Sequence, residues 1–364
     1  MHEWIDTAGA LAAWMEQRGA TKAPIGLDTE FMRTDTFRPK LALVQVNVGG
    51  AVALLDAPLL GAHPPLAERL TQPDAVCVMH SASEDLEALA PLLPHGPAQL
   101  YDTQIAAALA GHGAGLSYQK LVALLLGIDL PKAETRSDWL KRPLSAAQLD
   151  YAAQDVVHLP ALHAALDAQL GALGRREWLA DDCRRLVEKV RHPVPDLQPQ
   201  RAFRSAADWP RERQALLRRV LLWRDASART LDKPRSWILD DARALSFVSD
   251  LPADANALFE RSKGLRALRS AQRKELFDLL HAPLESGDFE LDTIPPPLTS
   301  AQKRRVGTLR DVVARVAAEL NLPEGLLCPR RHIEALVGEE TWPAALEGWR
   351  KGLLFEPLMA AMKD

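Results

Sequence analysis

Two proline-rich stretches set the strongest limit on how this chain can fold. The first contains Pro193, Pro195 and Pro199, and the second is the run Pro295–Pro297. Proline has no backbone N–H and fixes its own φ, so no helix or central strand continues through either stretch. A chain of 364 residues also exceeds what one hydrophobic core usually organises. We therefore expect three domains joined by semi-rigid linkers, over residues 1–192, 203–288 and 295–364.

The composition excludes several classes of protein. Hydrophobic residues make up 47% and charged residues 25%, as in an ordinary globular protein rather than a disordered chain. No run approaches the ~18 uncharged apolar residues of a membrane span, and the N-terminus lacks the basic-then-apolar order of a signal peptide. The three cysteines lie far apart, which excludes a disulfide framework and a zinc-finger spacing. We expect a cytoplasmic monomer with no membrane partner.

The first segment has the pattern of a mixed α/β domain. Apolar strand patterns cover residues 24–31, 40–48, 51–55 and 75–79, with the turn signal Gly49–Gly50 between the second and the third. Helical patterns follow over residues 83–93, 103–110 and 117–126. A last helix begins at Ser145, which forms a capping box with Gln148, and Pro160 is expected to kink it. Strands followed by helices predict a mixed sheet flanked by helices.

The two later segments have helical patterns and share a weak internal repeat. Arg224-Asp225-Ala-Ser-Ala-Arg229 recurs as Arg310-Asp311-Val-Val-Ala-Arg315. Each copy is followed by a turn proline, Pro234 or Pro323, and then by an apolar pair. The repeat predicts two small all-α helical-bundle domains that are copies of one module.

Acidic residues at the end of the first long strand form the first candidate site. Asp28 and Glu30 alternate onto one face of the strand predicted over residues 24–31. Two like charges beside a core are unfavourable unless a cation compensates them, and a divalent metal would do so. The alternative is a strand end at which both acids are solvated.

Two further motifs place acids on helices. Glu84 and Asp85 open the helix that follows the buried strand at 75–79, and stabilisation of the helix dipole is their alternative role. Tyr151 and Asp155 are four residues apart, so they stack on one helix face, an ordinary surface pair being the alternative.

Counting one acid from the pair Glu84 and Asp85, these motifs together supply four carboxylates and one phenol. Hard oxygen donors suit Mg²⁺ or Mn²⁺, and two such ions clamp the attacking and leaving oxygens of a phosphoryl displacement. A tyrosine is a poor proton acceptor at neutral pH, so we expect Tyr151 to orient a water molecule rather than to deprotonate it.

The order of the motifs, D-x-E, then D, then Y-x-x-x-D, resembles the DEDD superfamily of 3′→5′ exonucleases in its tyrosine variant. The histidine variant is disfavoured because it would want His where Asp150 stands. The similarity to the ribonuclease D family is closer and covers roughly residues 26–160. The helical remainder resembles the tandem HRDC modules of that family. The segments that carry the resemblance are residues 28–33, Gln45, 80–85, 101–104, 136–144 and 151–155, in that order.

The resemblance implies a fold, a reaction and a role for each acid. The fold would be a ribonuclease H-like nuclease domain followed by two HRDC-like domains. The reaction would be metal-dependent release of 5′-mononucleotides from a free RNA 3′ end, with transfer-RNA precursors as the substrate class. Asp28 would bridge two divalent ions, Glu30 and Asp155 would hold the ion that activates water, and Asp85 would hold the ion at the leaving oxygen. Tyr151 would position the attacking water.

Six other residues are candidates for binding substrate. Lys141 and Arg142 are expected to contact phosphates, with a solvated surface pair as the alternative. Gln45 is expected to order the site, with a buried, hydrogen-bonded amide as the alternative. The full set is Thr29, Phe31, Gln45, Trp139, Lys141 and Arg142.

Two other functions stay open at the level of the sequence. A DNA 3′→5′ exonuclease would use the same acids, because recognition of the 2′-OH is what separates the two activities. A non-catalytic RNA-binding adaptor is the second, although an intact set of acids argues against it. The net charge of −4 argues mildly against a nucleic-acid partner, but the proposed metal ligands contribute to it, and bound ions would supply local positive charge.

Overall fold

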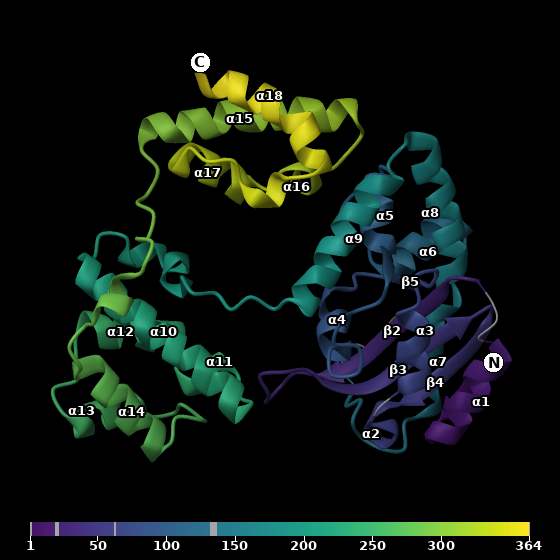
Figure 1. The fold of residues 1–364 in the computed structure, drawn as a ribbon, viewed down its shortest axis with the longest axis horizontal. Coiled ribbons are helices and arrows are strands. Elements are labelled where there is room, and N and C mark those ends of the chain that lie inside the picture. Colours follow the sequence, from purple (N-terminus) through teal and green to yellow (C-terminus); the bar gives the residue numbers. More distant parts are fainter. Residues whose placement is uncertain (1, 19–21, 62, 132–136, 364) are drawn as a thin grey trace. The chain divides into compact units, whose positions relative to one another are not determined.

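A six-stranded mixed sheet forms the centre of the first segment (Figure 1). The structure is a computed structural model that describes residues 2–18, 22–61, 63–131 and 137–363. The strands lie in the order β1-β4-β3-β2-β5-β6. Their bounds are β1 His2–Ile5, β2 Ile25–Met32, β3 Lys40–Val48, β4 Ala51–Asp56, β5 Val76–Met79 and β6 Gln99–Asp102.

The pairing of the strands confirms the mixed sheet predicted from the sequence. Strands β2, β3 and β4 pair antiparallel, whereas β1 is parallel to β4, β5 to β2 and β6 to β5. Gly49 and Gly50 both adopt positive φ in the turn between β3 and β4, where an L side chain would be strained. The predicted hairpin turn is therefore present.

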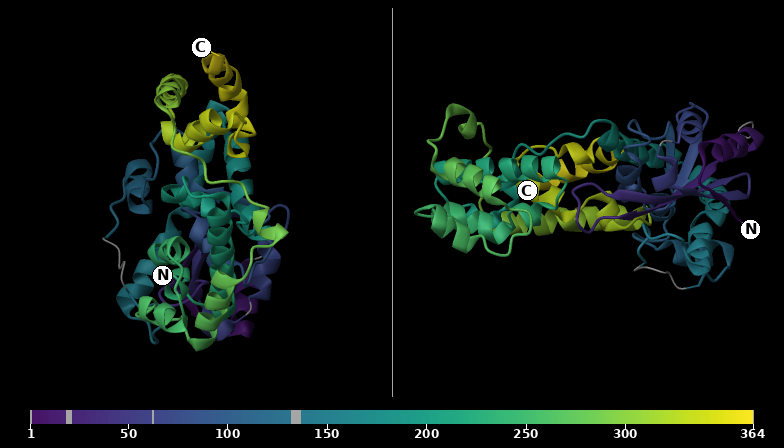
Figure 2. Two further views of the ribbon diagram at one scale, coloured as in Figure 1. Left: turned by 90° about the vertical axis from the view of Figure 1, so that its left-hand side faces the viewer. Right: turned by 90° about the horizontal axis from the view of Figure 1, so that it is seen from below.

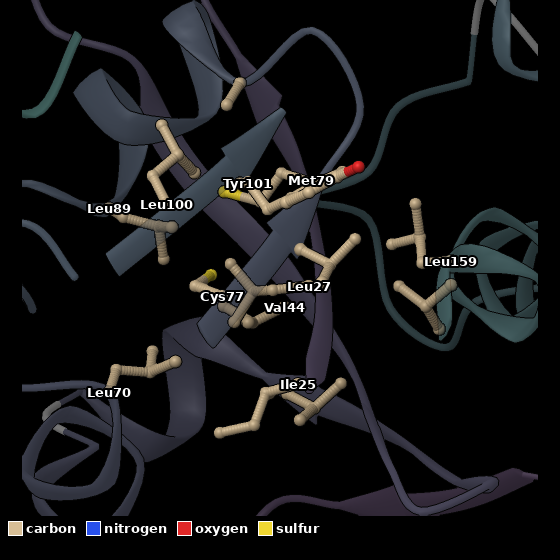
Figure 3. Packing of buried hydrophobic residues seen from close by; sticks show 14 of the residues in the cluster. Ile25, Leu27, Val44, Leu70, Cys77, Met79, Leu89, Leu100, Tyr101 and Leu159 are labelled. Atoms are coloured by element: carbon tan, nitrogen blue, oxygen red, sulfur yellow. The ribbon is translucent and has the colours of Figure 1, made fainter. Parts of the chain in front are cut away.

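The sheet is buried because its strands are apolar on both faces. Ile25, Leu27, Val44 and Cys77 are almost completely buried and pack together in one core (Figure 3). All three cysteines are buried and unpaired, in agreement with the prediction that they form no disulfide. The helices of this segment are α1 Ala8–Arg18, α2 Ala57–Leu60, α3 Pro64–Leu70, α4 Ser83–Leu89, α5 Thr103–Leu109, α6 Tyr118–Leu126, α7 Ala146–Val157, α8 Leu159–Leu173 and α9 Arg176–Arg191.

The long helix expected from Ser145 is two helices. Ser145 and Gln148 form the predicted capping box at the start of α7. Helix α7 ends at Val157, however, and Pro160 lies in the first turn of α8 rather than at a kink inside one helix. Proline is well tolerated there, because the first turn of a helix does not use its N–H groups for internal hydrogen bonds.

The remainder of the described chain is helical, and the order of its elements repeats. A long helix is followed by a four-residue helix capped by proline, Pro234 before α11 and Pro323 before α16, and then by a third helix. In the second copy, α15 and α18 pack side by side (Figures 1 and 2). The helices are α10 Arg211–Leu231, α11 Arg235–Ile238, α12 Asp241–Ser249, α13 Ala255–Arg261, α14 Ser270–His281, α15 Ser300–Glu319, α16 Glu324–Leu327, α17 Arg330–Glu339 and α18 Trp349–Lys363.

The chain forms two compact units. One comprises the described parts of residues 1–32, 40–193 and 300–364, and the other comprises residues 33–39 and 194–299. Within the first unit, the last helical segment packs against α9. Trp349 stacks on Trp178 with ring centroids 4.6 Å apart, and Arg350 forms a buried, bidentate ion pair with Asp182 at 2.5 and 2.8 Å.

The second unit includes the connection between β2 and β3. The guanidinium groups of Arg229 and Arg235 both lie over the Phe37 ring, 4.7 and 4.8 Å from its centroid. The backbone N–H groups of Phe37 and Arg38 both donate to the Asp232 carboxylate at 3.1 Å. Residues 33–39 are therefore held by side chains and caps of the helical module. In the described part of the chain, no helix has the length and apolarity needed to span a membrane.

Candidate active site

Strand β2 presents Asp28 and Glu30 toward α7. Residues Gly26, Asp28 and Glu30 share one face of β2, because successive side chains of a strand alternate. A side chain at Gly26 would lie within 3.3 Å of the Val156 carbonyl oxygen and 3.2 Å of Leu159 Cβ. The face that carries both acids is therefore the one against the end of α7 and the start of α8.

Strand β2 extends past its pairing with β5, and α4 begins at that point. Ile25 and Gly26 pair with Cys77 and Val78 of β5. Strand β5 then ends at Met79, and Asp85 lies in the first turn of α4. The carboxyl end of a parallel strand next to a change of direction is a common position for a site. The Thr29 hydroxyl donates to Asp85 Oδ1 at 2.5 Å, which ties α4 to β2.

Helix α7 contributes Tyr151 and Asp155. The Tyr151 hydroxyl is hydrogen-bonded to the Asp155 carboxylate, as their i,i+4 spacing allows. The Trp139 ring lies beside the Tyr151 ring, with centroids 6.0 Å apart. The Asn47 amide of β3 donates to the Val156 carbonyl at 3.0 Å and so fastens the end of α7 to the sheet.

All four carboxylates have raised pKa values, and in Asp28, Glu30 and Asp155 the charges of other members of the set contribute. Burial is the largest cause in each case, and it raises the pKa of Glu30 to about 8, of Asp155 to about 7 and of Asp85 to about 6. The pKa of Asp28 lies well above its usual range, because burial and the charges of Asp85, Asp155 and Glu30 all disfavour its ionised form. Strand β2 therefore places Asp28 and Glu30 within electrostatic range of Asp85 on α4 and Asp155 on α7.

Tyr151 keeps its proton in this setting. Burial, and then the negative charges of Asp155 and Glu30, raise the pKa of its phenol far above the usual range. The hydroxyl is therefore a hydrogen-bond donor at neutral pH and not a base.

The donor set fits a hard divalent cation. Among the described residues, no three Asp, Glu, His or Cys side chains converge closely enough to be a ready-made ligand set. The four clustered groups are nevertheless all carboxylates, the ligands that Mg²⁺ and Mn²⁺ prefer. No Lys or Arg in the described chain is among the groups that shift their pKa values, so repulsion within the cluster is uncompensated by protein cations.

Four of the six candidate substrate residues have buried or internally bonded side chains. Thr29 is buried and bonded to Asp85, and Trp139 is buried against Tyr151. Gln45 is fully buried, and its amide has no hydrogen-bond partner among the described residues. The alternative of a buried, hydrogen-bonded amide is therefore not what the structure has. Phe31 is partly buried at the end of β2, and Lys141 is exposed. Arg136, which begins one of the segments that carry the family resemblance, lies outside the described residues.

Arg142 differs from its predicted role as a phosphate contact. Its guanidinium forms an ion pair with buried Asp56, through Nε at 2.7 Å and Nη2 at 3.0 Å. Its other N–H groups donate to the carbonyl oxygens of Ala42, Trp139 and Lys141. All five donors are used inside the protein, so the group holds the segment before α7 against β3 and β4. Sequence reasoning missed Asp56, whose only local signal is an acid at the end of an apolar strand.

Comparisons with known proteins agree with this architecture. A family model described as a 3′-5′ exonuclease matches residues 2–171. The chain is 42% identical over 367 aligned residues to ribonuclease D of Xanthomonas oryzae pv. oryzae, covering 100% of this chain and 99% of that protein. It is 35% identical to ribonuclease D of Pseudomonas paraeruginosa, covering 100% and 98%.

A solved structure extends the similarity to the whole fold. The chain matches Escherichia coli RNase D, described as an exoribonuclease involved in structured RNA processing, with a TM-score of 0.88 and 27% identity. The match covers 100% of this chain and 99% of that one. The similarity confirms the predicted fold class, an α/β nuclease domain followed by helical domains.

Proposed function

This chain belongs to the ribonuclease D family of 3′→5′ exoribonucleases, and we propose that it releases 5′-mononucleotides from RNA by two-cation phosphodiester hydrolysis. Asp28 would bridge the two ions, Mg²⁺ or Mn²⁺. Glu30 and Asp155 would hold the ion near the attacking water, and Asp85 would hold the ion near the leaving oxygen. Bound there, the ions would acidify water and neutralise the charge that develops on the phosphate.

The protein's own groups complete this mechanism. Tyr151 keeps its proton and donates it in a hydrogen bond to Asp155, so its hydroxyl oxygen would orient the attacking water by accepting a hydrogen bond from that water. Thr29 fixes the orientation of Asp85 through the bond at 2.5 Å. Trp139 supports the Tyr151 ring. Phe31 and Lys141, at the end of β2 and just before α7, stay our candidates for direct contact with the RNA.

The observation that carries the proposal is a set of four buried carboxylates with raised pKa values, among whose causes no Lys or Arg of the described residues stands. Burial makes the ionised forms of Asp28, Glu30, Asp85 and Asp155 unfavourable. Divalent cations bound among these acids would remove that penalty, and this best explains why the fold buries them.

A time course on RNA labelled at its 5′ end tests the proposal. With Mg²⁺ we expect a ladder that shortens from the free 3′ end, and no ladder when that end is blocked. Asp28→Asn should remain folded and lose at least about 100-fold in rate, because it removes one charge from the bridging position. Random internal cuts, or full activity after removal of metal, would contradict the proposal. Matched RNA and DNA strands measure the preference for the 2′-OH.

Three further parts of the proposal concern the whole protein. We propose transfer-RNA precursors as the substrate class, a monomer as the active form and the cytoplasm as its location. We also propose the division into a nuclease domain at residues 1–192 and HRDC-like domains at 203–288 and 295–364. The repeated order of elements in the helical part supports the last of these. Nuclease assays on processed and unprocessed transfer RNA, and sedimentation analysis, test the first two.

A further inference from the structure

Gln45 is a fully buried amide in the middle of β3 with no hydrogen-bond partner. Its side chain has an exposed fraction of 0%, and neither its nitrogen nor its oxygen is bonded to another group among the described residues. An unpaired buried amide is unfavourable, because the hydrogen bonds to water that it loses on folding are not replaced. A methionine of similar shape would fill this place without that penalty. The amide therefore calls for a functional explanation.

The sheet register sets Gln45 beside the residue proposed to bridge the two ions. Gln45 is directly opposite Asp28 in the antiparallel pair formed by β2 and β3. Opposite residues share one face of the sheet, with Cβ atoms roughly 4.5–5.5 Å apart. Asn47, two residues further along β3, lies on the same face and donates to the end of α7. The Gln45 amide thus lies on the α7 side of the sheet, next to the Asp28 carboxylate.

Two of the other acids in the cluster already have a side-chain donor that orients them. Thr29 donates to Asp85, and Tyr151 donates to Asp155. Asp28 accepts a hydrogen bond from the backbone N–H of Thr29. The Gln45 amide, adjacent and unpaired, is placed to supply Asp28 with the side-chain donor that Asp85 and Asp155 have.

We propose that Gln45 is a positioning residue for Asp28: its amide N–H donates to the Asp28 carboxylate and fixes the orientation in which that carboxylate binds a divalent cation. The inference rests on the proposed two-cation function. Groups that orient metal ligands typically change metal affinity about 10–100-fold. The unpaired amide then destabilises the metal-free protein and finds its partner only when Asp28 is held as a ligand.

The substitution Gln45→Met separates this role from a structural one. It removes the amide while keeping the shape of the side chain, so the core stays filled. We expect Mn²⁺, titrated by calorimetry into the metal-free protein, to bind about tenfold more weakly or worse. We expect the melting temperature of the same metal-free protein to stay unchanged or to rise. The Mn²⁺ affinity should therefore fall while the melting temperature stays the same or rises.

Gln214 provides a matched control. It is also a buried glutamine, but its oxygen accepts from the Ile294 N–H at 2.7 Å and its nitrogen donates to the Trp209 carbonyl at 2.9 Å. Gln214→Met leaves these groups unpaired, so it should lower the melting temperature and leave Mn²⁺ affinity unchanged. The same chemical change is thus expected to give the opposite result at a satisfied position.

A second background shows whether the effect acts through Asp28. In an Asp28→Asn protein, Gln45→Met should cause no further loss of Mn²⁺ affinity, because the carboxylate that Gln45 orients is gone. If Gln45→Met lowers the melting temperature and leaves Mn²⁺ affinity unchanged in the otherwise native protein, Gln45 is structural and the inference is wrong. If the native protein itself binds no Mn²⁺, the proposed two-cation function fails, and this inference fails with it.

Discussion

Glu30 and Asp155 hold their protons to unusually high pH, because each is buried beside other acids. Burial and neighbouring carboxylates raise the pKa of Glu30 to about 8, and burial raises that of Asp155 to about 7. A raised pKa means that the folded state binds the proton more tightly than the unfolded chain does. These groups therefore stabilise the fold most fully below about pH 4, and that contribution is lost as the pH rises toward 8.

The prediction is a fall in the stability of the metal-free protein between about pH 5 and pH 8. Calorimetry on protein treated with a chelator should show a melting temperature several degrees lower at pH 8, and Mg²⁺ should restore more stability at pH 8 than at pH 5. Glu30→Gln cannot ionise, so it should have a shallower pH dependence. An equal slope in the native and Glu30→Gln proteins would show that Glu30 is not the source.

The hydroxyl of Thr29 controls the ionisation of Asp85. The bond at 2.5 Å favours the charged carboxylate and so opposes the effect of burial on the pKa of Asp85. Thr29→Val keeps the shape and removes the donor. We expect the pKa of Asp85 to rise above about 6, the acid limb of the pH–rate profile to move to higher pH, and activity at neutral pH to fall about tenfold.

Thr36→Val is the control for that substitution. Thr36 is also buried and donates its hydroxyl to a backbone carbonyl, that of Arg38, in the helical unit. The Thr36→Val substitution should leave the pH–rate profile on a short RNA unchanged. A profile that moves equally in both variants would mean that the Asp85 hydrogen bond is not responsible.

The local sequence pattern predicted the positions of the acids, but it did not predict the hydrogen-bond and ion-pair partners of the other polar residues. Alternation along a strand and i,i+4 spacing on a helix are short-range rules, and they placed Asp28, Glu30, Tyr151 and Asp155 on the faces where the structure has them. Arg142 was expected to contact phosphate because its partner, Asp56, lies far away in the sequence. Which polar groups meet across the sheet is a property of the tertiary fold, and no local rule predicts it.

At the scale of elements, the strands with strong alternation or long apolar runs were predictable, and the edge strands were not. The strand predicted over residues 40–48 is β3, and the capping box at Ser145 marks the start of α7. Strand β1 was not predicted. It has four residues, its middle two are exposed, and it exists because it pairs with β4, far along the chain. Short edge strands depend on their partners more than on their own propensity.

The position of α7 depends on Asn47, and this gives a prediction at the same scale. The Asn47 amide donates to the Val156 carbonyl, and its oxygen accepts from the Gly50 N–H in the hairpin turn. Asn47→Leu should lower the free energy of unfolding by about 1–3 kcal/mol, because it leaves buried backbone groups unpaired. Denaturation by urea measures the loss.

Asn47→Asp separates the two contacts. It keeps the oxygen that accepts from Gly50 and removes the donor to α7. Helix α7 carries Tyr151 and Asp155. This variant should therefore lose a larger fraction of its nuclease activity than a variant that alters the hairpin turn alone. Full activity with an unchanged midpoint in urea would show that Asn47 does not hold α7 in place.

At the scale of the whole molecule, the linkers are visible in the sequence but the grouping of the segments is not. The last helical segment packs in one unit with the nuclease segment, through contacts such as Trp349 on Trp178. Residues 33–39 belong instead to the other unit, where the guanidinium groups of two arginines lie over the Phe37 ring. In both cases the contacting residues are more than a hundred positions apart. Contacts that close such long loops leave no periodic pattern in the sequence.

The ion pair between Asp182 and Arg350 tests how firmly the last helical segment is attached. Both side chains are buried, their two hydrogen bonds measure 2.5 and 2.8 Å, and Trp349 Nε1 also donates to Asp182 at 3.2 Å. Asp182→Asn leaves a buried guanidinium without a counter-charge, so it should lower the free energy of unfolding by about 3 kcal/mol. The exposed pair between Arg330 and Glu334 in the same unit is the control, and Glu334→Gln should cost less than about 1 kcal/mol.

The double variant Asp182→Leu with Arg350→Met separates attachment by charge from attachment by packing. Replacing both members of a buried pair with apolar residues is often neutral, because the desolvation of two charges is removed along with their attraction. The variant leaves both rings of the Trp178–Trp349 stack unsubstituted. We therefore expect a smaller loss of free energy of unfolding than in Asp182→Asn, with the remaining loss coming from the Trp349 Nε1–H and the Leu326 carbonyl, which lose their partners. A loss as large as that of Asp182→Asn would mean that the ion pair itself, rather than apolar packing, holds the segment on α9.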